Sequence, residues 1–134
     1  MPNSGSLPGS ILQEFITAGR PNRPGTAIQP TSITMHNTSN TSPGADAKAH
    51  SRFVRETGYY MHKGKKNWVS WHYTVDDKMA IQHLPNTEMG WHAGPANGSS
   101  IGIEVCMHQG ISSTATLPTA AQLLSLPNCC EGSA

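Results

Sequence analysis

The sequence predicts a small single-domain protein of the α/β (α+β) class. Apolar and polar residues alternate, with many β-branched side chains, at Thr31–His36, at Val69–Val75, at Met79–Leu84 and at Ser99–Cys106, which is the pattern of half-buried strands. A stretch with helical spacing, Asp46–Tyr60, lies between the first two of these segments. The length of 134 residues corresponds to one domain.

The amino-terminal part is predicted to be a loose leader followed by a short helix. Residues 1–10 combine two Pro, two Gly and three Ser, and such a composition cannot bury enough apolar surface to order itself. Apolar residues have helical spacing from Ile11 to Ile16, and Gly19 and Pro21 then break the pattern. We therefore expect order to begin near Ile11.

The first strand and the helix after it each have a predicted inner face. Thr31–His36 places Ile33 and Met35 on one face of a strand and turns His36 to the other face. In the helix Asp46–Tyr60, we expect the side chains of Ala49 and Phe53 to point inward, and Gly58 falls where the helix should end.

The rest of the predicted sheet is a hairpin and one further strand. Residues 63–67 (KGKKN) form a charge cluster typical of a solvated turn. Residues 69–75 and 79–84 flank turn residues and predict an antiparallel hairpin. In the strand 99–106, three β-branched residues share one face, so Glu104 lies on the opposite face.

Composition excludes several classes of function. Nine Lys and Arg against eight Asp and Glu give a net charge of +1, so there is no basic field for a nucleic acid. No apolar run approaches the ~20 residues of a membrane span. The first basic residue is Arg20, so the start of the chain does not resemble a secretory signal peptide. Cys106, Cys129 and Cys130 do not form a disulfide framework.

Three local features are candidates for chemistry, and each has a structural alternative. His36 ends a strand, where a metal ligand would be held rigidly, but a hydrogen-bonded structural histidine is the commoner case. Glu104 places a carboxylate within an apolar strand, where an unpaired charge is costly and usually has a function. The structural alternative is a carboxylate paired with another side chain at the edge of the sheet. Trp91 and His92 stand between Gly90 and Gly94, in either a binding loop or a packed one.

The other histidines point to structural roles. We interpret His72 as an interior imidazole bonded to backbone, and His50 and His62 as surface residues. Neither His83 nor His108 has a sequence neighbour that suggests a special role.

Five segments occur in a fixed order over ~75 residues, and together they resemble one family. They are T-M-H-N-T, S-W-H-Y-T-V-D-D, H-L-P-N, G-W-H-A-G and S-I-G-I-E-V-C-M. The chain is similar, over roughly residues 11–110, to the zinc-dependent N-acetylmuramoyl-L-alanine amidases of phage and prophage endolysins, which are related to peptidoglycan-recognition proteins. The resemblance implies a mixed central sheet flanked by helices.

The resemblance also implies roles for particular residues. His36 matches the first histidine ligand of a zinc ion, and Glu104 matches the glutamate that orients or deprotonates the zinc-bound water. Trp91 and His92 match the groove segment that lies against the glycan and the peptide stem, and Asn37 is assigned to the same groove. Trp71 stands where some phage amidases have a catalytic tyrosine, so that role does not transfer.

The carboxyl-terminal part departs from the family pattern. We divide the chain into a leader (1–10), an amidase-like domain (11–110) and an abbreviated or altered tail (111–134), which contains no histidine. Cys129 and Cys130 are candidate substitutes for the missing zinc ligands, and we expect zinc to bind weakly or not at all. A short helix around residues 120–126 would bring them toward His36.

Two functions follow from the resemblance. The first is hydrolysis of the amide bond between N-acetylmuramic acid and L-alanine in bacterial peptidoglycan. The second is non-catalytic binding of muropeptides by a relic without a complete metal site. We expect a monomer that is made in the cytoplasm and acts on the cell wall after release, with no nucleic acid and no membrane as partner.

Overall fold

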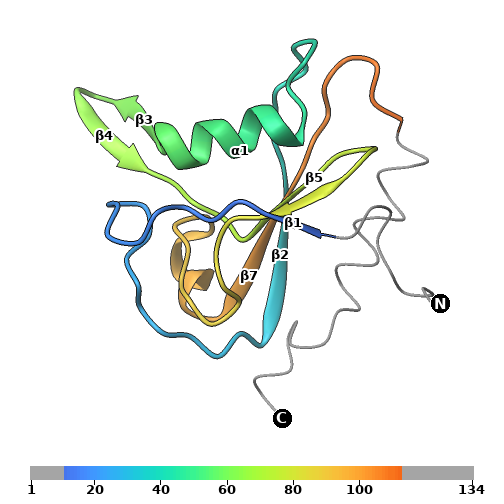
Figure 1. The fold of residues 1–134 in the computed structure, drawn as a ribbon. Helices are drawn as coiled ribbons and strands as arrows, with labels where there is room; N and C mark the ends of the chain where they lie inside the picture. The colour runs from blue at the N-terminus through green and yellow to red at the C-terminus, as the bar shows by residue number, and fades with distance from the viewer. Residues whose placement is uncertain (1–10, 113–134) are drawn as a thin grey trace, which may run out of the picture.

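A computed structural model describes residues 11–112, so the predicted leader and nearly all of the predicted tail lie outside the described part. A five-stranded sheet in the order β1-β6-β5-β7-β2 forms the centre (Figure 1). Its strands are β1 (Ile11–Gln13), β2 (Ser32–Asn37), β5 (Tyr73–Val75), β6 (Ala80–Gln82) and β7 (Ser100–Val105). The β5–β6 pair is antiparallel and the other neighbours are parallel, which confirms the mixed central sheet.

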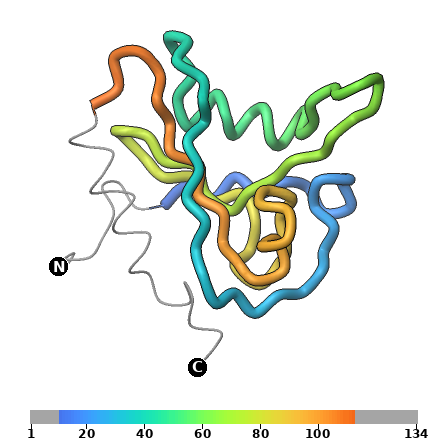
Figure 2. The backbone as a smooth tube through the Cα atoms, turned by 180° about the vertical axis from the view of Figure 1, so that it is seen from behind, coloured from blue at the N-terminus to red at the C-terminus, as the bar shows by residue number. Residues whose placement is uncertain are grey.

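The other elements lie around this sheet. Helix α1 (Ala47–Glu56) runs over one face, and a two-stranded hairpin of β3 (Tyr59–His62) and β4 (Lys65–Trp68) extends beyond its carboxyl end (Figure 1). A short 3-10 helix, η1 (Gly94–Gly98), precedes β7. The tube in Figure 2 shows β2 and β7, which are far apart in the sequence, running side by side.

The predicted helix at Ile11–Ile16 is wrong, because this segment is extended. β1 pairs in parallel with β6, with Ile11 opposite Ala80. The pairing continues beyond the strand, since the backbone N–H of Ile16 donates to the carbonyl of His83 over 2.9 Å. A distant strand satisfies the backbone here, so the short helical spacing does not decide the local structure.

The predicted helix Asp46–Tyr60 is present but shorter. Asp46 caps it, and its carboxylate accepts a hydrogen bond from the N–H of Ala49 over 2.9 Å. The helix ends at Glu56, and Tyr59 and Tyr60 belong to β3.

The inward face of α1 also differs from the prediction. Its buried residues are Ala47, Ser51 and Val54, whereas Ala49 and Phe53 are only half-buried. The stripe of α1 that faces the core is therefore formed by Ala47, Ser51 and Val54.

The charged turn is confirmed, although it is narrower than predicted. Lys63 and Gly64 both have positive φ, 51° and 79°, as a two-residue hairpin turn requires. Lys65, Lys66 and Asn67 are already in β4.

The antiparallel hairpin of the main sheet is confirmed as β5 and β6, each only three residues long. One cluster of the core lies on the sheet and is formed by Tyr73, Val75, Ala80, Ile101 and Ile103. Two further clusters contain Val54 and Ala47 of α1. Within residues 11–112, no helix has the length and apolar character needed to cross a membrane.

Candidate functional site

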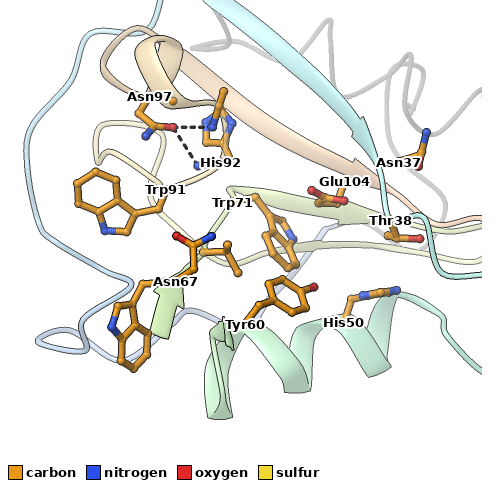
Figure 3. Close-up of a pocket in the computed structure, with 14 residues that line it drawn as sticks. Asn37, Thr38, His50, Tyr60, Asn67, Trp71, Trp91, His92, Asn97 and Glu104 are labelled. Atoms are coloured by element: carbon orange, nitrogen blue, oxygen red, sulfur yellow. Dashed lines mark hydrogen bonds between the residues drawn. The ribbon is translucent and has the colours of Figure 1, made fainter. Parts of the chain in front are cut away.

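A pocket of about 420 Å³ opens between the sheet, α1 and the β3–β4 hairpin (Figure 3). Fourteen residues line it: Asn37, Thr38, His50, Tyr60, Asn67, Trp68, Val69, Trp71, Trp91, His92, Ala93, Gly94, Asn97 and Glu104. Four of the predicted site residues are therefore brought together, namely Glu104, Trp91, His92 and Asn37. The fifth, His36, contacts the pocket through His92.

Glu104 and His36 are register partners on the parallel strands β7 and β2. Because paired residues of neighbouring strands project from the same face of a sheet, both side chains lie on the pocket side. The alternation of apolar residues predicts this placement, and the structure agrees with it. The common face is the geometric condition for the two groups to act on one substrate.

The carboxyl group of Glu104 is partly buried, and burial raises its pKa to about 7. Tyr60 lines the same pocket. Burial raises the pKa of its phenol, and the nearby charge of Glu104 raises it further. Near neutral pH, the carboxyl group is therefore divided between its acidic and basic forms. This is the condition in which one group can both accept and donate a proton.

Three imidazoles form a row beside Glu104. Nε2 of His36 lies 3.3 Å from Nδ1 of His92, and the rings of His72 and His92 meet edge to face at 5.8 Å between centroids. Burial lowers the pKa of His36, and it lowers the pKa of His92 to about 4. The row is therefore neutral near pH 7, which is the form of histidine that binds metals.

Hydrogen bonds from its backbone hold the loop that carries Trp91 and His92. The N–H of Trp91 donates to the hydroxyl of Ser70, and its carbonyl accepts from the N–H of Ser70, both over 2.9 Å. The Asn97 side-chain oxygen accepts from the N–H groups of His92 and Ala93, over 2.9 Å and 2.7 Å (Figure 3). The side chains of the loop are thus presented to the pocket from a fixed backbone.

His72 has the interior role that the sequence predicts. Its Nδ1 accepts from the N–H of Gly102 over 3.0 Å, so its Nε2–H donates to the carbonyl of Glu88 over 2.7 Å. Burial lowers its pKa to about 4. The imidazole therefore joins β7 to the loop before Trp91.

His83 has a structural role, in a chain of hydrogen bonds that its sequence neighbours do not indicate. The Trp71 indole N–H donates to the Thr74 hydroxyl over 2.6 Å, and this hydroxyl lies 2.7 Å from Nε2 of His83. Nδ1 of His83 then faces the carbonyl of Glu14 at 3.3 Å. Thr74 comes from the neighbouring strand of the predicted hairpin, whereas Glu14 is 69 residues away, beyond the reach of any local pattern.

The pocket also contains residues that the sequence analysis did not select. His50 was interpreted as a surface residue, but it is half-buried in the pocket wall and burial lowers its pKa. Tyr60, Asn67 and Asn97 also line the pocket, and no sequence pattern marks them. A helical-wheel projection of α1 could have flagged His50, since it is one turn before buried Val54.

Asn37 makes hydrogen bonds within its own loop, and Cys106 is buried. The side-chain oxygen of Asn37 accepts from the N–H and the hydroxyl of Ser39, over 3.0 Å and 2.9 Å. Cys106 is a buried thiol, and burial raises its pKa.

A zinc ion in a protein takes three or four protein ligands. His36 and His92 are adjacent, but no group of three or more His, Cys, Asp or Glu side chains within residues 11–112 could hold a metal. Cys129 and Cys130 lie outside the described residues. The described part alone therefore does not fit a complete zinc site.

Comparison with known proteins identifies the family. The model of the N-acetylmuramoyl-L-alanine amidase family matches residues 26–133. The chain belongs to this family. The amidase XlyA of Bacillus subtilis (strain 168) is 52% identical over 101 residues, which are 72% of this chain and 31% of XlyA. The chain thus spans about a third of that relative's length.

Solved structures agree with this amidase-family assignment. The catalytic domain of XlyA superposes with a TM-score of 0.76 at 43% identity, covering 86% of this chain and 72% of the domain. A Drosophila peptidoglycan recognition protein, PGRP-SD, shares the fold at 19% identity and a TM-score of 0.59, covering 94% of this chain and 79% of that one. Amidases of this family are generally zinc-dependent.

Proposed function

We propose that this protein hydrolyses the amide bond between N-acetylmuramic acid and L-alanine in bacterial peptidoglycan. The proposal rests on the position of Glu104, whose partly buried carboxyl group lines the pocket on the same face of the sheet as His36. An amide is stable at neutral pH, so its hydrolysis needs a group that activates water and then protonates the departing nitrogen. The family assignment supports this substrate.

Glu104 performs both proton transfers in the proposed reaction. Its carboxylate takes a proton from a water molecule as the water oxygen bonds to the amide carbon. The carboxylic acid then gives this proton to the amide nitrogen as the carbon–nitrogen bond breaks. The products are the carboxylic acid of the muramic acid side chain and the free amino group of L-alanine.

Trp91, His92 and Asn37 bind the substrate in this proposal. Trp91 is about one-third exposed (37%) at the pocket, so it offers an aromatic face to a sugar ring or a peptide. The firmly held loop that carries Trp91 and His92 keeps this face in place. Such positioning lowers the cost of orienting the amide toward Glu104.

We assign His36 as a zinc ligand, with any further protein ligands outside residues 11–112, where Cys129 and Cys130 are the candidates. A bound zinc ion would supply a Lewis acid and lower the pKa of its water. We also propose that the protein acts as a monomer on the cell wall after release from the cytoplasm.

The test is digestion of purified cell walls by the full chain. Cleavage of this amide releases amino groups of L-alanine and leaves the number of reducing sugar ends unchanged. New reducing ends without new amino groups would instead show cleavage of the glycan and would contradict the proposal.

A further inference from the structure

Within residues 11–112, most of the Lys and Arg side chains that form neither an ion pair nor a hydrogen bond with a backbone carbonyl lie on the β3–β4 hairpin. Lys63, Lys65 and Lys66 are exposed there beside exposed His62, and the sequence has no Asp or Glu between Glu56 and Asp76. Four of the other six basic residues are engaged elsewhere, in ion pairs or with backbone carbonyls: Arg20, Arg23, Lys48 and Arg55. The remaining two, Arg52 and Lys78, lie on α1 and in the β5–β6 turn.

These basic groups surround a hollow. His62, Lys63, Lys65, Lys66 and Asn67 line a second cavity of about 510 Å³. His62 and Lys65 are directly opposite each other in the register of the hairpin. Basic groups at paired positions repel when both are charged, and an anion between them would relieve the repulsion.

Aromatic side chains hold one of the lysines in position. The ammonium of Lys66 lies 4.5 Å from the centre of the Tyr59 ring and 5.5 Å from that of Trp68. Such cation–π contacts already restrict the lysine side chain. Binding an anion therefore costs less side-chain entropy than it would with a free lysine. The charge is therefore preorganised on the side of the hairpin where Trp68 enters the main pocket.

The two cavities share a wall. Asn67 lines both the hollow of the hairpin and the pocket that contains Glu104. A polymer seated in the main pocket can therefore extend over Asn67 onto the hairpin. The group that reaches the lysines must carry negative charge to gain from them.

We propose that the β3–β4 hairpin is a binding site for anionic oxygens, carboxylate or phosphate, on the wall polymer whose amide occupies the main pocket. This inference rests on the proposed function for the identity of the polymer. The lysines bind as point charges, so they accept either anion. Two sources carry this chemistry: carboxylates of the peptide stems and phosphodiesters of a polymer attached to the wall.

The test is sedimentation of the full chain with purified walls, in a Glu104→Gln background so that cleavage does not interfere. The double variant Lys63→Gln, Lys65→Gln is compared with Arg52→Gln, Lys78→Gln, which has the same net charge. We expect the hairpin variant to bind walls about fivefold more weakly at low salt and the control to bind as the parent does. Circular dichroism melts check that both variants are folded.

Raising the salt concentration and extracting wall phosphate complete the test. High salt should weaken the parent more than the hairpin variant. If extraction leaves the difference between parent and hairpin variant intact, the stem carboxylates are the ligand, and if it removes the difference, the phosphates are. Equal loss in both double variants, no loss in either, or no binding by the parent would overturn the hairpin site. Because cleavage is absent from this assay, failure of the amidase proposal is detected separately by the digestion experiment.

Discussion

The imidazole of His92 packs against the backbone of Gly102 so closely that a Cβ at Gly102 would lie 2.7 Å from the ring. Real Cβ atoms do not approach a neighbour to this distance, so the absence of a side chain at residue 102 sets the position of His92. The G-W-H-A-G loop can therefore lie this close to β7 only because residue 102 has no Cβ.

Gly102→Ala is therefore expected to displace His92 and to lower the rate of wall digestion at least tenfold. The reason is the clash with the ring, whose position also governs its contact with His36. The matched control is Gly98→Ala, because a Cβ at Gly98 meets no atom within 4 Å. Equal activity of the two alanine variants would show that the position of His92 does not matter.

The buried histidines predict loss of stability in acid. His72 and His83 have a pKa of about 4 in the folded protein, against 6.5 when exposed. Between pH 4 and pH 6.5 these two histidines bind more protons in the unfolded chain than in the folded protein. The stability of the folded protein is therefore highest, as far as these histidines are concerned, above pH 6.5, and it decreases as the pH falls toward 4. Each should cost roughly 2 kcal/mol of the free energy of unfolding at pH 5.

Glu104 acts in the opposite direction, since its raised pKa makes the folded state less stable as the pH rises from 4.5 to 7. Urea unfolding at pH 7.5 and pH 5 is therefore best measured in Glu104→Gln, where this contribution is absent. A free energy of unfolding that is equal at the two pH values would contradict the neutral state of these histidines.

The metal assignment predicts that His36→Ala lowers the zinc affinity of the full chain by at least tenfold. The double variant Cys129→Ser, Cys130→Ser should also lower it if either cysteine is a ligand. His62→Ala is the control, because His62 is exposed on the hairpin and outside the main pocket. Zinc titration followed by calorimetry reads the affinity without any activity assay, and tight binding that survives the cysteine changes would exclude both cysteines.

Local sequence patterns are sufficient to predict which face of its own strand a side chain occupies. The alternation of residues 99–106 placed Glu104 opposite the apolar face, and the same rule placed His36. The pattern failed at Ile11–Gln13, because this strand is fixed by pairing with β6, 69 residues away. Local pattern also gives no sign of the contact between His83 and Glu14, because these two residues are 69 positions apart.

Glu104→Gln tests most directly whether Glu104 is the acid and base of an amidase. The change keeps the size of the side chain and removes its ability to take a proton. The measurement is the rate of L-alanine amino groups released from purified walls, with a thermal melt of the same sample to confirm folding. A folded variant whose rate falls by ~10²–10⁴ is the predicted result, and a folded variant that cleaves at the rate of the parent would contradict the account.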